Sequence, residues 1–230
     1  MIPRLSVIIP ARDEAQALPL LLANLAGLRA GGAELIVVDG GSRDATAALA
    51  VPCADQVLES SPGRARQMNA GAAVARGDYL WFVHADTQIS AESIQCLLEV
   101  LAERPLWGRF DVRLSGHSLS LRLIGMMISL RSRLTGVASG DQGIFVARAS
   151  FEALGGYADI PLMEDIELSR RLKKKARPRC LRPALLTSSR RWERHGVWRT
   201  VLLMWRLRLA YYCGASPARL ARQYRGGPPL

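Results

Sequence analysis

The sequence predicts an α/β protein with a mostly parallel β-sheet and helices on both faces of that sheet. Short apolar runs rich in β-branched residues alternate with segments of helical periodicity over roughly the first 90 residues, which is typical of a parallel sheet. Polar and acidic residues directly follow these runs, and such sheets bind ligands at the carboxyl ends of their strands. A chain of 230 residues can also bury a sizeable core.

The predicted elements alternate along the chain. Ser42 is expected to cap helix 42–50, with Asp44 in its first turn, where the helix dipole favours an acid. Strands are expected within residues 5–10, 34–39, 54–60 and 79–87, helices within 14–28, 42–50, 63–77, 91–103 and 163–176, and a strand followed by a helix within both 109–134 and 140–157.

The excess of positive charge is confined to the end of the chain. The net charge is +11, yet residues 1–176 hold 19 basic and 19 acidic side chains, whereas residues 177–230 hold 12 arginines and one acid, Glu193. This change of composition predicts an α/β domain over residues 1–190 and a basic amphipathic helical tail over residues 191–230. Such a tail can meet nucleic acid, anionic lipid or a phosphorylated substrate, or it can serve solubility alone.

The sequence predicts a soluble, cytoplasmic body. No apolar segment reaches the roughly 18 uncharged residues that a membrane-spanning helix needs, and the N-terminal apolar run is too short for a signal peptide. The four cysteines are far apart and form no C-x-x-C pair, so they indicate reduced thiols rather than a zinc or redox site. They are Cys53, Cys96, Cys180 and Cys213.

Two acids end predicted strands. Asp39 precedes Gly40 and Gly41, which allow a backbone to approach a ligand closely, so its carboxylate suits a base N–H or a ribose hydroxyl. The alternative is that Asp39 only stabilises a turn. Asp86 can hold a divalent cation that binds a diphosphate, although an Asp at a strand end is more often a turn residue. His84 lies on the same strand face as Asp86, so both can line one pocket.

A third pair of acids, Glu164 and Asp165, begins the helix predicted within residues 163–176. Acids are favoured at a helix start in any case, because of the helix dipole. The functional interpretation is a general base at the mouth of the site. Adjacent carboxylates on a helix point in different directions, so we expect one to face the ligand and the other to pair or cap.

A basic cluster marks the start of the tail. Arginine forks bind phosphate oxygens two at a time, and a histidine can complete a metal site. An exposed basic face is the alternative interpretation of the same residues. The cluster comprises Arg190, Arg191, Arg194 and His195 around Trp192.

Five segments, in this order, resemble a family 2 glycosyltransferase of the GT-A fold. The resemblance spans about residues 4–195. Its later part also resembles a bacterial subgroup described as radical-SAM or selenodomain-associated transferases, in "GDQGIFV", "LMEDIELSRRL" and "TSSRRWE". The five segments are "SVIIPARDEA", "IVVDGGSRDAT", "GRARQMNAGAAVARGDYLWFVHADT", "SGDQGIFVARASFEALGGY" and "MEDIELSRRL".

The resemblance implies roles for individual residues. The nucleotide would contact Pro10, Ala11, Arg12, Glu14, Asp39, Arg66 and Asn69, with Asp39 binding the base. The catalytic motif would be Glu164 and Asp165, with Asp165 as the base, and the diphosphate would meet Arg191 and Trp192. Asp86 would be the last acid of an Asp-x-Asp metal motif, and the chemistry of the basic cluster, not the resemblance, adds His195 as the second candidate metal ligand. His84 replaces the first acid of that motif, which puts the need for a metal in doubt.

The implied activity is transfer of a sugar from a UDP- or GDP-linked donor to an unidentified acceptor hydroxyl, with inversion and with Mg²⁺ or Mn²⁺. One hypothesis for the tail is a peripheral contact with the inner face of the cell membrane, which would suit a lipid-linked acceptor. It is based on Trp198, Trp205, Arg199 and Arg206. Packing of the tail on the domain, or on a second subunit in a homodimer, stays open.

Three other classes of protein fit less well. A nucleotidyltransferase of a sugar phosphate would normally have a glycine-rich basic loop after the first strand, and "PARDEA" has no glycine. A nicotinamide dehydrogenase would show the G-x-G-x-x-G spacing, which is missing after residue 39. A nucleic-acid-binding module would leave the acids at the strand ends without a role, so no nucleic-acid partner is expected.

Overall fold

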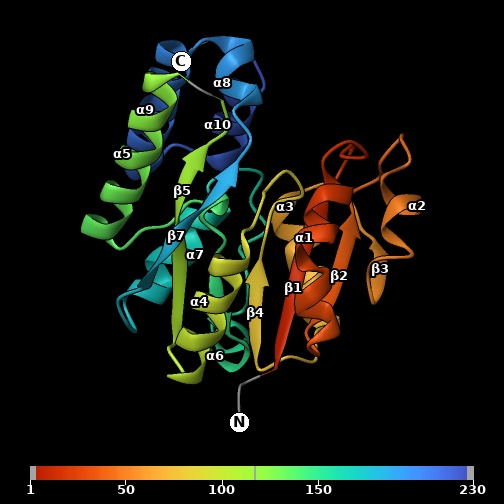
Figure 1. Ribbon diagram of the computed structural model, residues 1–230. Coiled ribbons are helices and arrows are strands. Elements are labelled where there is room, and N and C mark those ends of the chain that lie inside the picture. The colour runs from red at the N-terminus through yellow and green to blue at the C-terminus, as the bar shows by residue number, and fades with distance from the viewer. Residues whose placement is uncertain (1–3, 117, 227–230) are drawn as a thin grey trace.

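The computed structural model describes residues 4–116 and 118–226, and it confirms the predicted sheet. Within these residues seven strands form one mixed sheet in the order β3-β2-β1-β4-β6-β5-β7 (Figure 1). The first four strands are parallel, β6 runs antiparallel to β4 and β5, and β7 is parallel to β5. The strands are β1 (Leu5–Ala11), β2 (Glu34–Asp39), β3 (Gln56–Glu59), β4 (Tyr79–Phe82), β5 (Trp107–Leu114), β6 (Phe145–Ala147) and β7 (Arg179–Thr187).

Helices cover both faces of the sheet, as predicted. The described helices are α1 (Leu18–Ala30), α2 (Thr46–Ala50), α3 (Arg64–Val74), α4 (Ala91–Ala102), α5 (Leu119–Thr135), α6 (Arg148–Ala153), α7 (Glu164–Lys173), α8 (Arg190–His195), α9 (Val197–Tyr212) and α10 (Pro217–Tyr224), with a 3₁₀ turn at Gly140–Gln142. In β1, Val7 and Ile9 join the core beneath α1, whereas Ile8 joins the core beneath α3. The alternation buries the whole of β1, which explains why its sequence is continuously apolar.

The helix α2 begins four residues later than predicted, and the prediction that Ser42 caps it is wrong. Its N-cap residue is Ala45. The Ser42 hydroxyl instead donates to the Asp39 carboxylate and accepts from the Asp13 N–H at 2.9 Å. The Asp44 carboxylate accepts from the Ala15 N–H at 3.1 Å. These side chains therefore join two loops at the carboxyl ends of β1 and β2, rather than extend a helix.

The strand β7 was not predicted. It is the edge strand beside β5, and it contains Pro183 and the exposed Arg179 and Arg182. Proline is tolerated on an edge strand because no neighbour needs its missing N–H. The apolar side chains of Leu181 and Leu185 are buried in the core beneath α1 and α4, so only part of the strand carries the expected apolar pattern.

The helices of the tail pack on the rest of the molecule. Leu207 of α9 and Leu220 of α10 lie in one apolar cluster with Met163 and Ile166 at the start of α7. Figure 1 shows these helices at the end of the sheet toward which the parallel strands point. In the ranges that the structure covers, no helix combines the length and the apolar character required for a membrane span.

Candidate active site

Two adjoining cavities lie at the carboxyl ends of the parallel strands. The first, of about 550 Å³, lies between the end of β1, the start of α3 and α10, and we call it the β1–α3 cavity. The second, of about 330 Å³, lies between the starts of α7 and α8 and the side of α9, and we call it the α7–α8 cavity. Both are lined by Arg64, His84, Leu162, Glu164 and Tyr224. They are therefore two parts of one cleft.

The β1–α3 cavity contains most of the residues predicted to contact a nucleotide. Pro10, Ala11, Arg12, Glu14 and Arg66 all line it. The polar members are already paired, since Arg66 Nε lies 2.9 Å from Asp159 Oδ1 and Glu14 Oε2 lies 2.8 Å from Arg190 Nη2. The cavity is thus polar, and its pairs are exposed enough to exchange with a ligand.

Asp39 lies beside this cavity rather than on its surface. It is buried, and its Oδ2 accepts from the backbone N–H groups of Gly41 at 3.0 Å and Ser42 at 2.9 Å. Asp39 pairs in register with Ala11, which lines the cavity. Asp39 therefore stabilises a turn in this structure, which was the alternative interpretation. It lies on β2, the strand next to the one that lines the cavity.

Asn69 has a structural contact. Its side-chain amide donates to the Tyr157 carbonyl at 2.8 Å and accepts from the Tyr157 N–H at 2.9 Å. Gln67, two residues earlier on α3, does line the cavity, and its side chain donates to the carbonyls of Ala11 and Val38, both at 2.8 Å. A Cβ atom on Gly40 would lie 2.9 Å from the Gln67 side chain, so this glycine is required by the close packing.

Glu164 and Asp165 both line the α7–α8 cavity. Asp165 Oδ2 accepts from the Gly140 N–H at 2.7 Å, and its Oδ1 accepts from the N–H of Ile166 at 2.7 Å. Glu164 is buried, and this burial, together with the negative charge of Asp165, raises the pKa of Glu164. The preceding residue, Met163, has a φ of +73°, which is rare for a residue other than glycine and fixes where the helix begins.

A histidine and two further acids complete the acidic side of this cavity. His84 Nδ1 lies 3.3 Å from Asp141 Oδ1, and Asp86 Oδ2 lies 3.3 Å from Arg190 Nη2. Burial acts to raise the pKa of Asp141, but the hydrogen bond and charge of His84, together with the charges of Arg64 and Arg208, outweigh it, so this pKa is lowered. Sequence reasoning gave Asp141 no role. The available signal was its position as the only acid of the segment "GDQG".

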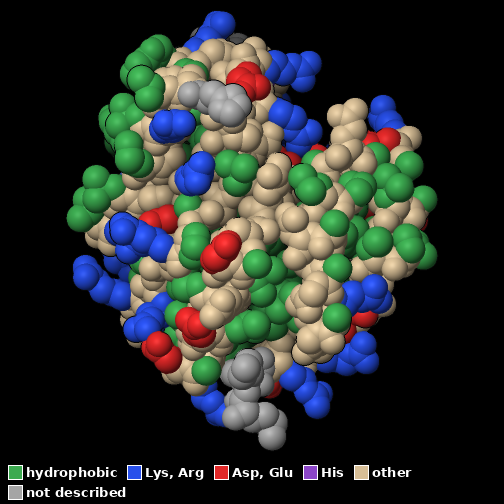
Figure 2. All heavy atoms as spheres, viewed as in Figure 1, with side chains coloured by type: hydrophobic (Ala, Val, Ile, Leu, Met, Phe, Trp, Pro, Cys, Tyr) green, Lys and Arg blue, Asp and Glu red, His purple; other side chains and the backbone are tan. Residues whose placement is uncertain are grey.

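Arginines from the tail form the basic side of the cleft. Arg190 bridges Glu14 and Asp86, and Arg208 lines the α7–α8 cavity with Trp192. Arg191 also lines it, donates to the carbonyl of Tyr224 at 2.8 Å, and lies 3.6 Å from the centre of the Tyr224 ring. In Figure 2, basic and acidic side chains meet at the notch between the tail helices and the loops of the first strands.

The predicted metal ligands are not brought together. His195 lines another cavity, with Arg199 and Arg206, in which Asp86 takes no part. Within residues 4–116 and 118–226, no group of three His, Cys, Asp or Glu side chains could hold a metal ion. These residues therefore fit a cation only if the cation is bound by Asp86 and takes most of its other ligands from the substrate. Magnesium commonly binds phosphates in this way.

Fold and cleft together define a class of protein. It is an α/β protein with acids and arginines around a cleft at the carboxyl ends of parallel strands, which suits a phosphorylated ligand. The sequence model of glycosyl transferase family 2 matches residues 6–147. The chain belongs to this family.

Similar proteins of known sequence are glycosyltransferases by name. An uncharacterized glycosyltransferase of Mycobacterium tuberculosis is 32% identical over 167 residues, which is 67% of this chain and 63% of that protein. The PGL/p-HBAD biosynthesis glycosyltransferase of the same organism is 35% identical over 94 residues, 38% of this chain and 37% of that protein. An uncharacterized glycosyltransferase of Haemophilus influenzae is 28% identical over 104 residues, 44% of this chain and 35% of that protein. The matched region thus spans only about a third of the length of the last two relatives.

Solved structures share the GT-A fold. TarS of Staphylococcus aureus, in a structure with UDP-GlcNAc, has a TM-score of 0.66 at 19% identity, covering 80% of this chain and 58% of that chain. The mannosyltransferase PcManGT of Pyrobaculum calidifontis, in complex with GDP-Man and Mn²⁺, has a TM-score of 0.56 at 19% identity, covering 82% and 57%. At this identity the likeness concerns the fold alone.

Proposed function

We propose that this protein transfers a sugar from a UDP- or GDP-linked donor to an acceptor hydroxyl, with inversion at the anomeric carbon. The observation that carries the proposal is the composition of the cleft. The acids Asp86, Glu164 and Asp165 and the arginines 190, 191 and 208 line the same α7–α8 cavity, which shares lining residues with the β1–α3 cavity. Family membership and the UDP-GlcNAc and GDP-Man named in the two solved neighbours support the choice of donor.

The nucleotide is assigned to the β1–α3 cavity, which is the larger of the two. Arg12, Glu14 and Arg66 offer charged groups on its surface, and Pro10 and Ala11 offer backbone at the end of β1. Asp39 is proposed to accept a hydrogen bond from the base. Its carboxylate would then exchange one of its present contacts in the turn for the ligand.

The diphosphate is assigned to the arginine side of the α7–α8 cavity. Arg191 and Trp192 are the residues that we predicted for this role, and Arg190 and Arg208 lie on the same cavity. Preorganised cations stabilise the charge that develops on a departing diphosphate. Arg190 is now held by Glu14 and Asp86, so donor binding would draw it away from at least one of them.

Asp165 is the proposed general base. A base must lie within hydrogen-bond reach of the acceptor hydroxyl, about 2.6 to 3.2 Å, once both substrates are bound. A proton accepted by Asp165 leaves the acceptor oxygen free to attack the anomeric carbon from the face opposite the diphosphate.

A divalent cation, Mg²⁺ or Mn²⁺, is proposed to bind through Asp86. When bound, it would supply positive charge to the phosphates of the donor. The replacement of the first acid of the motif by His84, which is paired with Asp141, leaves one carboxylate for this role. We therefore expect weak metal binding in the absence of the donor.

The acceptor is proposed to be lipid-linked and presented at the inner face of the cell membrane. The exposed Trp198 and Trp205 of α9 support this proposal, because tryptophan is an interfacial residue type. The segments "GDQGIFV" and "TSSRRWE" further support membership of the subgroup described as radical-SAM or selenodomain-associated transferases.

A thermal-shift panel of sugar nucleotides, with and without manganese, tests the donor assignment. A ligand that binds only the folded state adds about 2.7 kcal/mol of stability at one hundred times its Kd. UDP-GlcNAc or GDP-Man is expected to raise Tm, and free UDP or GDP to raise it less. If no sugar nucleotide raises Tm at any concentration, the cleft is not a donor site.

A further inference from the structure

Two helices leave apolar side chains exposed on the same side of the molecule. In α5 these side chains are Leu119, Leu123, Met126, Met127, Leu130 and Leu134. In α9 they are Trp198, Leu202, Trp205, Leu209 and Tyr212. Each is between 47% and 79% exposed. Their spacing of three or four residues places them along one side of each helix, and we call the two rows together the apolar face.

The two helices are neighbours. Val197 and Val201 of α9 pack against a cluster that contains Leu121 and Ile124 of α5. Figure 1 shows the helices side by side at one end of the molecule, and Figure 2 shows hydrophobic side chains gathered over them. The inner sides of both helices are thus used for packing, and the apolar face is an additional surface. Contiguous exposed apolar patches on a folded protein mark interaction sites.

The charges on these helices favour an anionic bilayer over a second copy of the chain. Between them, α5 and α9 contain six arginines and no acid. Two copies joined through this face would bring arginines close to arginines. An anionic membrane surface attracts arginines, while the tryptophans and leucines enter the boundary between headgroups and acyl chains.

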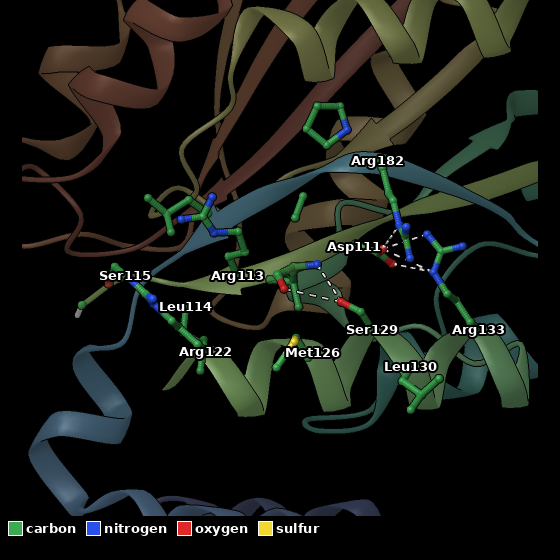
Figure 3. Close-up of a pocket in the computed structure, with 15 residues that line it drawn as sticks. Asp111, Arg113, Leu114, Ser115, Arg122, Met126, Ser129, Leu130, Arg133 and Arg182 are labelled. Carbon is green, nitrogen blue, oxygen red and sulfur yellow. Dashed lines mark hydrogen bonds and ion pairs between the residues drawn. The ribbon is translucent and has the colours of Figure 1, made fainter. Parts of the chain in front are cut away.

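A cavity of about 850 Å³ lies between α5, β5 and β7 (Figure 3). Four arginines line it, Arg113, Arg122, Arg133 and Arg182, against one acid, Asp111. Both carboxylate oxygens of Asp111 are already paired. Its Oδ2 lies 2.8 Å from Arg133 and 3.1 Å from Arg182, and its Oδ1 pairs with the buried Arg109. For Arg113 and Arg122, no side-chain hydrogen bond or ion pair is found among the residues that the structure describes.

The cavity and the apolar face are continuous. Met126 and Leu130 line the cavity and also belong to the exposed row of α5. Figure 3 shows both side chains on α5 beneath β5, between Arg122 and Arg133. A ligand with a phosphate beside the arginines would therefore have its apolar part over α5. This combination fits an amphiphile better than a small polar anion.

We propose that the cavity between α5, β5 and β7 binds the phosphate headgroup of an anionic membrane lipid while the apolar face rests on the bilayer. The inference deepens the membrane contact that we proposed above, but it does not depend on the donor or on the chemistry of transfer. It assigns the contact to a cavity outside the cleft and to α5 as well as to the tail.

Flotation of the full chain with vesicles tests this proposal. Vesicles of phosphatidylcholine are compared with vesicles of equal parts phosphatidylcholine and phosphatidylglycerol, with no sugar nucleotide present. The wild type is expected to float with the anionic vesicles. Arg113→Gln with Arg122→Gln, which leaves the ion pairs of Asp111 intact, is expected to weaken this binding about ten- to thirty-fold. Leu202→Gln with Trp205→Gln is expected to weaken binding to the same vesicles at least as much.

Matched controls separate the site from general charge and hydrophobicity. Lys174→Gln with Lys175→Gln removes two exposed charges elsewhere, and Leu49→Gln with Val51→Gln removes two exposed apolar side chains of or next to α2. Both controls are expected to float like the wild type. Equal losses in the lysine control and in the arginine variant would overturn the headgroup site, because binding would then follow net charge alone.

Two other results would also overturn the proposal. Binding of inorganic phosphate to the cavity without flotation of the wild type would identify a site for a soluble anion. Dimeric wild type that becomes monomeric in Leu202→Gln with Trp205→Gln, again without flotation, would identify an interface between two copies. A thermal shift with sugar nucleotides in the same preparation shows whether the donor cleft is intact, so failure of this inference is distinguishable from failure of the proposed function.

Discussion

The two halves of the sheet differ in where they place charge. In β1, β2 and β4 the strands are mainly apolar and fully or nearly fully buried, and apart from Glu34 at the start of β2 their acids, such as Asp39 and Asp86, come at or after the carboxyl ends. In β5, by contrast, charge lies within the strand, where Arg109 is 0% exposed and pairs with Asp111. The first half thus keeps charge out of the middle of its strands, and the second half buries an ion pair within one.

The cleft combines residues of the first half of the sheet with residues from the end of the chain. Glu14 and Asp86 come from the first half, and the arginine that bridges them, Arg190, comes from the start of the tail. Arg191 and Arg208 add cations from the same region. The first half therefore supplies a sheet edge and acids, and the end of the chain supplies the cations that a phosphorylated ligand requires.

The largest expected effect is that of Asp165→Asn on turnover. If Asp165 is the general base, its loss should lower kcat about 100- to 10,000-fold, while the Kd for the donor stays close to that of the wild type. Donor turnover and calorimetry with the donor measure the two quantities. Glu167→Gln on the same helix, where Glu167 pairs with Arg171, is the matched control. Turnover of Asp165→Asn at the wild-type rate would move the base to another residue.

Asp111→Asn tests the charges inside β5. The substitution leaves the buried Arg109 without its carboxylate, and such losses cost about 3 to 5 kcal/mol of unfolding free energy. Glu152→Gln, which removes an exposed ion pair at 3.7 Å, is the control and should cost at most about 1 kcal/mol. Urea unfolding measures both. Equal stability of the two variants would mean that water screens Arg109.

The contribution of Asp111 to the free energy of unfolding should depend on pH. Burial raises the pKa of Asp111, but hydrogen bonds from Arg133 and Arg109 outweigh it and leave the pKa below its ordinary value of 3.8. A carboxyl whose folded pKa is lowered stabilises the fold above its unfolded pKa and loses this contribution as the pH falls through the folded value. The difference in unfolding free energy between the wild type and Asp111→Asn should therefore become smaller below pH 3.8.

Leu207→Ala tests whether the tail is part of the folded unit. Leu207 is 0% exposed in the cluster with Met163. Shortening its side chain to alanine should therefore lower the free energy of unfolding by about 2 to 5 kcal/mol, in a single unfolding transition. Leu209→Ala on the same helix is the control, because Leu209 is 66% exposed and should change stability by about 0.5 kcal/mol or less. If both variants unfold like the wild type, α9 does not contribute to the fold.

The smallest expected effect is a gain of stability in Glu164→Gln. A carboxyl whose folded pKa is raised makes the fold less stable as the pH rises above its ordinary value of 4.5, because the folded state then retains a proton that the unfolded state loses. Glutamine removes this penalty. Unfolding at neutral pH should show a more stable variant, and the difference should vanish in acid. A variant that is less stable at neutral pH would show that Glu164 is held as a charged partner.

Much of the fold could be predicted because the first half follows simple periodicities. The strands β1, β2 and β4 are marked by apolar runs, α1 and α4 by leucines at helical spacing, and α3 by small residues. The strand β7 could not be predicted, because an edge strand tolerates Pro183 and exposed arginines that interrupt its apolar pattern. The start of α2 was mispredicted because the Ser42 hydroxyl bonds to Asp39, a contact across a turn that helix capping statistics do not include.

The candidate site was predictable only where residues follow a strand or begin a helix. Glu14, Asp86 and Asp165 line the cleft as the order of the strands implies. The contributions of Tyr224 and Arg208 could not be predicted, because they depend on how α9 and α10 pack over the sheet edge. The placement of Asn69 also depends on packing, since its amide holds the backbone of Tyr157.

Hydrogen exchange of the full chain, with and without UDP-GlcNAc or GDP-Man, tests the central claim most directly. A cleft made by the first half of the sheet and the end of the chain predicts protection of three segments at once, within residues 10–14, 62–67 and 221–225, which contribute to the β1–α3 cavity. Protection confined to the cavity of α5, β5 and β7, or to the first half of the chain alone, would contradict it.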